Sequence, residues 1–238
     1  MTINKTIKTI AAVAALAVGA GANAGPVYEY ERGAGNFGGA GGEYGFDSIF
    51  AQYDTNDQSF TWEVDYAAGN APREDAGNGS DAATGGWLVI NPGGNPKRSD
   101  NELAILYFDR SSNSVWAYAY NGLNSSNSWE TTEFLGHFEN AYQTERDVAT
   151  LSINVAGINA ALETGVQFDT TIGIWFHPAF GGTSANIGEN GELTGFSFKD
   201  AVWYDTNGED AVNVAAPATL ALLGMGLMGL GARRRKLV

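Results

Sequence analysis

The chain has 238 residues, of which 27 are acidic, 13 are basic and none is cysteine. This length allows one ordinary domain with short targeting segments, and the lack of cysteine excludes a disulfide-stapled miniprotein. All the acidic residues lie between Glu29 and Asp210, together with only seven basic ones, so this stretch carries a net charge of −20. A surface of this charge repels phosphate backbones, and we therefore expect no nucleic-acid partner.

The first 24 residues have the layout of a secretory signal peptide. Lys5 and Lys8 precede an apolar run over residues 10–20, and residues 22–24 read Ala-Asn-Ala, which fits the A-x-A pattern of a cleavage site. We expect cleavage after Ala24 and export of the remaining chain.

Residues 25–211 are expected to form one all-β domain, an antiparallel β-sandwich or jelly roll. Residues 60–66, FTWEVDY, alternate apolar and polar side chains, which is typical of a strand with one buried and one solvated face. Comparable runs, separated by turns rich in Gly, Asn and Asp, predict about nine strands in all; the other runs cover residues 46–54, 86–91, 102–109, 114–120, 133–142, 148–155, 166–177 and 193–204. The one helix expected is a turn or two at residues 158–162. The glycine-rich tracts 32–45 and 68–86 are predicted to be loops.

Glu63 and Asp65 are the best candidates for a pair of catalytic carboxylates. They lie at i and i+2 and therefore on one strand face, and WEVDYA resembles the E-x-D-x-x-E strand of laminarinase-like glycoside hydrolases. Ala68 stands where that motif carries its acid/base carboxylate. We therefore interpret the two side chains as a solvated strand face and expect no catalytic residues, with a polysaccharide hydrolase or lyase as the alternative.

The two histidines, His137 and His177, have no second ligand at metal spacing, so we expect no zinc site. His177 is followed by Pro178, which has no backbone N–H to donate to a neighbouring strand. We therefore expect the strand to end there.

Asp205, Asn207 and Glu209 occupy positions one, three and five of a calcium-binding loop. The glycine of such a loop belongs at position six, and here it falls at residue 208, while position twelve is Ala216. We expect no metal and no cofactor from this pattern, and Asp-Thr-Asn is also good turn sequence. Calcium held by oxygen ligands from distant loops stays open as an alternative.

Aromatic residues at alternate positions of one strand suggest a carbohydrate-binding platform. Trp116, Tyr118 and Tyr120 share one face of the strand at residues 114–120, and Trp129 follows a polar loop. Rings about 7 Å apart along a strand could stack on successive sugar rings, with nearby asparagines as hydrogen-bond partners. The alternative, which we favour, is that the rings fill the sandwich core.

The segment 212–238 reads as a membrane anchor. Residues 215–232 carry no charge, and as a helix they measure about 27 Å, close to the roughly 30 Å of a hydrocarbon core. Arg233, Arg234, Arg235 and Lys236 follow as a stop signal. By the positive-inside rule they stay cytoplasmic, and the acidic domain lies on the opposite side of the membrane.

This tail, VAAPATLALLGMGLMGLGARRRK, resembles a PEP-CTERM sorting signal of Gram-negative bacteria. In that family a proline-containing motif precedes a hydrophobic helix and an Arg-rich end; here Ala216, Pro217, Ala218 and Thr219 take the place of the motif. The resemblance implies processing by an exosortase, transient anchoring in the inner membrane, and delivery to the cell surface or biofilm matrix, where members are associated with exopolysaccharide. We expect a non-enzymatic structural or glycan-binding component, with exosortase, the membrane and exopolysaccharide as its partners.

Overall fold

The computed structural model describes residues 25–33, 46–66, 85–94, 102–120, 133–145, 147–201, 204–205 and 208–214. The predicted signal peptide, transmembrane helix, sorting motif and basic end lie outside these ranges, and so does Trp129. Residues 28–213 form one compact unit, and the fold is described for this unit.

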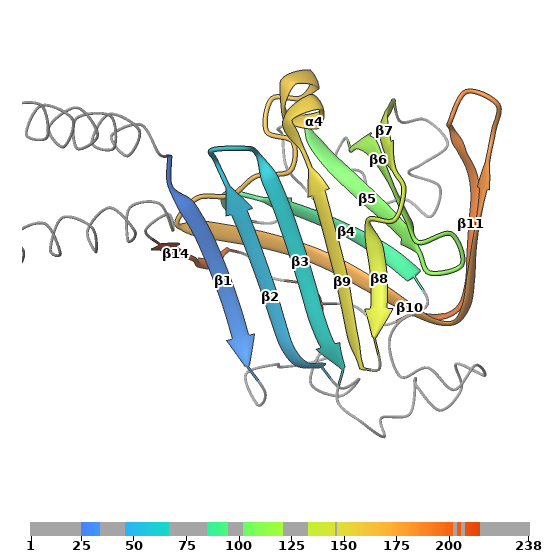
Figure 1. Cartoon of the computed structure of the whole chain (residues 1–238), viewed down its shortest axis with the longest axis horizontal. Coiled ribbons are helices and arrows are strands. Elements are labelled where there is room, and N and C mark those ends of the chain that lie inside the picture. Colours follow the sequence, from blue (N-terminus) through green and yellow to red (C-terminus); the bar gives the residue numbers. More distant parts are fainter. Residues whose placement is uncertain are drawn as a thin grey trace, which may run out of the picture. The chain divides into compact units, whose positions relative to one another are not determined.

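Two antiparallel sheets make up the unit (Figure 1). The first has six strands in the order β14–β1–β2–β3–β9–β8, with bounds Val212–Val214, Val27–Gly33, Phe46–Asp54, Ser59–Tyr66, Val148–Asn154 and Tyr142–Glu145. The second follows the path β11–β10–β4–β5–β6–β7, with bounds Leu193–Ala201, Thr171–Ile187, Gly85–Asn91, Leu103–Asp109, Ser114–Tyr120 and Phe134–Phe138. The short strands β12 (Tyr204–Asp205) and β13 (Glu209–Asp210) pair with β10, and the helix α4 spans Ala156–Ala161. Most neighbours in each sheet are consecutive in the chain, as in meanders rather than in the interleaved sheets of a jelly roll.

The main core lies between the two sheets, as the alternation in β3 predicts. Phe60, Trp62, Val64 and Tyr66 are buried, while the residues between them are only half-buried. Trp62 meets Phe176 of β10 edge-on, with ring centroids 5.1 Å apart. One cluster of buried side chains joins both sheets in this way, and burial of this apolar surface is the main stabilising contribution.

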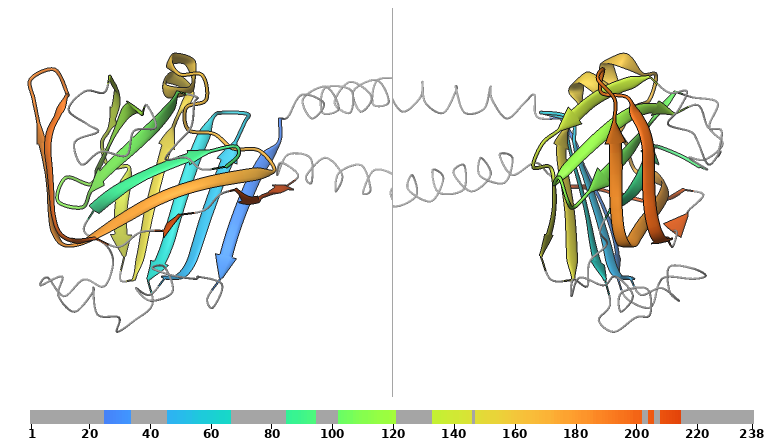
Figure 2. Two further views of the ribbon diagram at one scale, coloured as in Figure 1. Left: turned by 180° about the vertical axis from the view of Figure 1, so that it is seen from behind. Right: turned by 90° about the vertical axis from the view of Figure 1, so that its right-hand side faces the viewer.

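A second core covers the outer face of the eight-stranded sheet. All seven residues of β5 are buried, so this strand has no solvated face. The outward side chains of β4, β5, β6 and β10 form a separate apolar cluster, and Leu193 of β11 belongs to it. Strand β10 has 17 residues and continues into a long hairpin with β11 (Figure 2). Leu193 of this hairpin is part of the outer cluster, and Ala185 packs against it.

The prediction that the strand ends at Pro178 is wrong, because β10 runs through it to Ile187. Pro178 lies opposite Gly86 of β4. A Cβ on Gly86 would lie 2.2 Å from the carbonyl oxygen of His177 and 3.0 Å from the Cα of Pro178. A glycine opposite the proline therefore lets the two backbones approach closely, and the sheet continues past the missing amide.

The other predicted elements are largely confirmed. Strands β2, β5, β6 and β9 match the expected runs within a residue, and α4 lies where a short helix was expected. The run 133–142 contains β7 and only the first residue of β8, and these two strands belong to different sheets. Strand β1 was not predicted.

Candidate functional site

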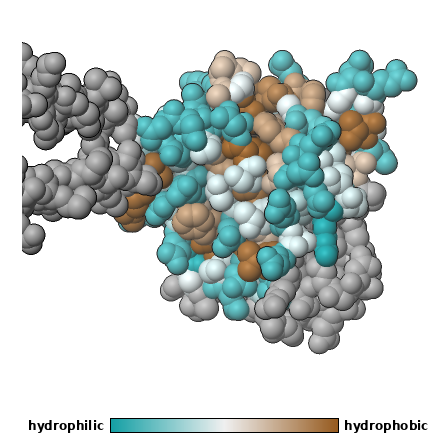
Figure 3. Space-filling view, viewed as in Figure 1, coloured by the Kyte–Doolittle hydropathy of each residue, from teal (hydrophilic) through white to brown (hydrophobic). Residues whose placement is uncertain are grey.

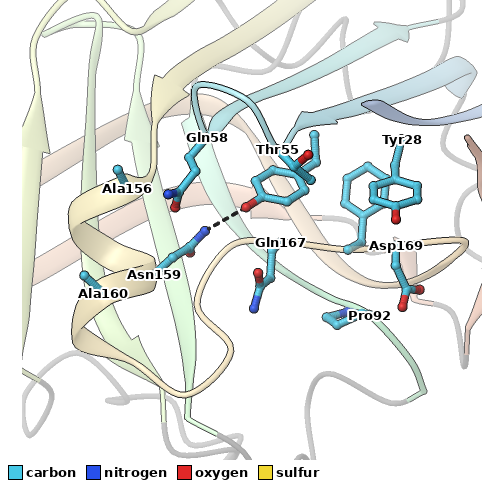
Figure 4. Close-up of a pocket in the computed structure, with 11 residues that line it drawn as sticks. Tyr28, Thr55, Gln58, Pro92, Ala156, Asn159, Ala160, Gln167 and Asp169 are labelled. Carbon is cyan, nitrogen blue, oxygen red and sulfur yellow. Dashed lines mark hydrogen bonds between the residues drawn. The ribbon is translucent and has the colours of Figure 1, made fainter. Parts of the chain in front are cut away.

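The candidate site is an open hollow of about 610 Å³ at one end of the unit (Figure 4). The turn between β2 and β3, the helix α4 and the segment leading into β10 surround it. Its lining residues are Tyr28, Tyr53, Thr55, Gln58, Pro92, Ala156, Asn159, Ala160, Gln167, Phe168 and Asp169. These residues come from segments far apart in the sequence, so the fold alone brings them together.

Short-range hydrogen bonds fix the turn that carries Thr55 and Gln58. Asp54 Oδ1 accepts hydrogen bonds from the backbone N–H and the side-chain amide of Asn56, at 2.8 and 2.6 Å. Gln58 has a φ of 54°, in the left-handed region, and closes the turn into β3. The Asp-Thr-Asn sequence at residues 54–56 therefore acts as turn sequence.

Asn159 of α4 holds the opposite wall of the hollow in place. Its Oδ1 accepts a hydrogen bond from the backbone N–H of Val166 at 2.8 Å, and its Nδ2 donates to the hydroxyl of Tyr53 at 3.3 Å. Gly165 passes close to this side chain with a φ of 69°, and a Cβ there would lie 2.3 Å from Asn159 Oδ1. Burial raises the pKa of Tyr53, so its phenol stays protonated at neutral pH.

The hollow combines aromatic surface with uncharged polar groups. Tyr53 and Phe168 form a buried aromatic floor, with ring centroids 6.2 Å apart, and Tyr28 is half-buried beside it. Gln58 and Gln167 offer half-buried amides, each with donors and an acceptor. Figure 4 shows these two side chains on different sides of the hollow. Aromatic surface with a few convergent polar groups is typical of small-molecule sites.

The carboxylate of Asp169 lies at the edge of this hollow. Asp169 is exposed, and its Oδ1 accepts a hydrogen bond from the backbone N–H of Thr171 at 3.0 Å. The described residues that line the hollow include no lysine, arginine or histidine. The hollow therefore has a negative edge and no cationic counterpart in this lining.

Three residues of the predicted aromatic platform, Trp116, Tyr118 and Tyr120, are buried, while Trp129 lies outside the described residues. Trp116 is 5% exposed, Tyr118 0% and Tyr120 1%. The three rings belong to the outer cluster, while Val115 and Ala117 of the same strand face the core between the sheets. The Tyr118 hydroxyl donates to the carbonyl oxygen of Gly191, at the tip of the β10–β11 hairpin, at 2.9 Å. The rings are therefore core residues, as in the alternative that we favoured, although of the outer core rather than the sandwich core.

One of these rings, Trp116, also belongs to a row of rings that runs across the strands. His177, Trp87, Tyr107, Trp116 and His137 lie opposite one another in successive strands from β10 to β7. The two histidines stack on the tryptophans at the ends of the row: His177 lies 4.9 Å from Trp87 and His137 lies 5.2 Å from Trp116, between ring centroids. Cross-strand aromatic pairs of this kind stabilise sheets, so we assign both histidines a structural role.

Glu63 and Asp65 line a second hollow of about 550 Å³, on the outer face of the six-stranded sheet. Two further carboxylates, Glu145 and Asp147, line it as well. The hydroxyl of Thr150 donates to Glu63 Oε2 at 3.3 Å. Figure 3 shows a largely hydrophilic surface over these strands. The structure thus places more carboxylates near Glu63 and Asp65 than the sequence motif indicated.

Glu209, one of the three calcium candidates, takes part in a different interaction. It accepts hydrogen bonds from Tyr30 and Arg32 of β1, and the Tyr204 hydroxyl donates to its Oε1 at 3.2 Å. Burial alone raises the pKa of Glu209, but these hydrogen bonds and the positive charge of Arg32 outweigh it and leave the pKa lowered. Burial raises the pKa of Tyr204 to about 12. Arg32 therefore supplies the positive charge beside Glu209.

No cluster of three or more Asp, Glu or His side chains within the described ranges is arranged to hold a metal ion. The same ranges contain no helix with the length and apolar character needed to cross a bilayer. Comparisons of the chain with protein-family models, with curated proteins and with solved structures found no match.

Proposed function

We propose that the protein is an exported, non-enzymatic component of the cell surface or biofilm matrix that binds exopolysaccharide. The signal-peptide layout and the PEP-CTERM-like tail support export, transient anchoring in the inner membrane and sorting by an exosortase. The observation that carries glycan binding is the open hollow beside α4, with its aromatic rings and amides. We therefore propose this hollow as the binding site instead of the buried rings of Trp116, Tyr118 and Tyr120.

The size and chemistry of the hollow suit a sugar unit. Its volume of about 610 Å³ falls within the roughly 300–1,000 Å³ of small-molecule sites. A sugar ring has apolar C–H faces that pack on the ring of Tyr28, and its hydroxyls both donate and accept hydrogen bonds, as the amides of Gln58 and Gln167 do. The openness of the site is compatible with a polymer that enters and leaves it.

Substitution of one amide tests this assignment. We expect Gln167→Ala to weaken glycan binding about twofold to tenfold, which corresponds to the loss of one net hydrogen bond of about 0.5–1.5 kcal/mol. Gln143→Ala is the matched control, because Gln143 lines the second hollow and is exposed. Isothermal titration with an oligosaccharide that binds the wild type measures both. Equal affinity of the wild type and Gln167→Ala would contradict the assignment.

Deletion of residues 233–238 tests the sorting part of the proposal. Loss of the basic end removes the charges that hold the C-terminus in the cytoplasm, so we expect anchoring or processing to fail. Fractionation of cells measures where the protein accumulates. Unchanged membrane retention and surface delivery would refute this part of the account.

The second hollow favours one other function, a polysaccharide hydrolase or lyase. Glycoside hydrolysis needs two carboxylates, and four line this hollow. If the protein releases oligosaccharides from a polymer and Glu63→Gln abolishes this release, the result favours an enzyme over a non-enzymatic binding protein. Release that persists in Glu63→Gln would exclude this hollow as the source.

A further inference from the structure

We infer that the hollow beside α4 prefers sugar units with a protonated amine, such as glucosamine, over neutral units, and that it rejects uronate units. This inference rests on the proposed glycan-binding function and adds the charge class of the ligand. It follows from the carboxylate of Asp169, which lines the hollow, and from the lack of lysine, arginine and histidine among the described lining residues.

Asp169 supplies the attraction for a cationic sugar. The hydrogen bond from Thr171 occupies its Oδ1 and fixes the orientation of the carboxylate at the edge of the hollow. A sugar ammonium group that reaches this carboxylate gains a charge-assisted hydrogen bond, which is stronger than the bond a sugar hydroxyl makes there. Tyr28 and Asp169 both line the hollow, and Figure 4 shows their side chains at the same end of it.

The same geometry disfavours an anionic sugar. A uronate carboxylate in the hollow would lie near Asp169, and the lining residues that the structure describes include no lysine, arginine or histidine to compensate. The net charge of −20 over residues 29–210 adds to this repulsion over longer distances. Salt screens the long-range part, because the Debye length is about 8 Å at physiological ionic strength. At this ionic strength the remaining repulsion of an anionic sugar comes from the nearby carboxylate of Asp169.

The effect on affinity is moderate because Asp169 is exposed. Ion pairs in contact with water contribute little, and charge-assisted hydrogen bonds contribute somewhat more. We therefore expect the amine to improve binding about threefold to tenfold over the matching neutral sugar. A larger preference would require a second carboxylate in the hollow.

The test uses the full chain, purified in a mild detergent without a sugar headgroup. Isothermal titration at about pH 6 and about 150 mM salt, where the Debye length is about 8 Å, compares three probes of equal length: a trimer of glucosamine, a neutral glucose trimer and a trimer of glucuronate. Each is titrated into the wild type, into Asp169→Asn and into Asp47→Asn. The last variant is the matched control, because Asp47 is exposed at the start of β2, at the far end of the strand from Tyr53, and its substitution removes the same charge.

We expect the glucosamine trimer to bind wild type about threefold to tenfold more tightly than the glucose trimer, and the glucuronate trimer to bind most weakly. Asp169→Asn should remove the preference for the amine and keep the binding of the glucose trimer, whereas Asp47→Asn should change neither. Equal affinity for the amine and neutral trimers, or an equal effect of both variants, overturns the inference and leaves the proposed function standing. Absence of binding by all three trimers overturns both.

Discussion

The outer aromatic cluster makes a sharp prediction at Tyr118. Replacement by Phe removes only the hydroxyl, which donates to the Gly191 carbonyl at 2.9 Å. Tyr118 is completely buried and Gly191 is half-buried, so water replaces the lost partner of the Gly191 carbonyl only in part. Loss of such a bond costs about 1–2 kcal/mol.

This loss should be visible in thermal unfolding. A domain of this size shifts its Tm by roughly 2–4 °C per kcal/mol, so Tyr118→Phe should lower the Tm by about 2–8 °C. Tyr118→Ala should cost about 3–5 kcal/mol, since it also opens a cavity beneath the hairpin. Thermal unfolding followed by circular dichroism measures both variants, and hydrogen exchange shows whether the β10–β11 hairpin opens first.

Glycan affinity tests whether Tyr118 is a core residue or part of the carbohydrate-binding platform that the sequence suggested. Tyr118→Phe should bind oligosaccharides as tightly as wild type, because the ring lies in the core and not in the hollow beside α4. A Tyr118→Phe variant with unchanged Tm and weakened glycan binding would refute the structural role of Tyr118 in the outer cluster and restore it to a binding surface. Tyr28→Phe is a matched control for stability, because Tyr28 is only half-buried and its substitution should change the free energy of unfolding by less than about 0.5 kcal/mol.

Three further predictions concern other parts of the fold. Because the pKa of Glu209 is lowered in the folded state, its ionised carboxylate stabilises that state above the pKa of the unfolded chain, near 4.5, and this stability is lost as the pH falls through the folded pKa. In urea unfolding at a series of pH values, the free energy of unfolding of Glu209→Gln should therefore fall less steeply toward acid pH than that of the wild type. An unchanged pH dependence would contradict the role of Arg32. Gly86→Ala should lower the free energy of unfolding by more than about 2 kcal/mol, because its Cβ would lie 2.2 Å from a carbonyl oxygen. Gly157→Ala in α4 has open space around it and should leave the free energy of unfolding unchanged or raise it. Equal effects of the two variants in thermal unfolding would refute this difference. Asn159→Ala removes the support of the hollow and should lower both stability, by about 1–3 kcal/mol, and glycan affinity; lower stability with full affinity would show that the wall does not position the site.

The sequence predicted the strands well where polarity alternates and poorly where it does not. In β3 the polar residues mark one face, and the structure confirms which side is buried. In β5 the residues from Leu103 to Phe108 are all apolar, and in β6 the alternation is one of size rather than polarity, so no local pattern shows that a hairpin covers the outer face. The exception is β1, which was not predicted although its tyrosines alternate with glutamates in a readable period-two pattern.

The candidate site was beyond prediction from spacing. Tyr28, Gln58 and Gln167 lie on three separate segments, and no motif connects them. The signals that do exist are local: a turn between the runs 46–54 and 60–66 and a short helix at residues 158–162 were both expected, and each forms part of the wall. Pro178 shows the opposite error, since a rule about single strands failed where Gly86 on the neighbouring strand accommodates the proline.

Binding and turnover measured in the same samples test the central claim most directly. The full chain, in a detergent without a sugar headgroup, is incubated with a panel of bacterial and algal polysaccharides, with calcium and then with chelator, and released oligosaccharides are assayed in the same tubes. We expect binding to at least one polysaccharide without release and without dependence on calcium. Release of oligosaccharides, or no binding to any polymer of the panel, would contradict the proposed function.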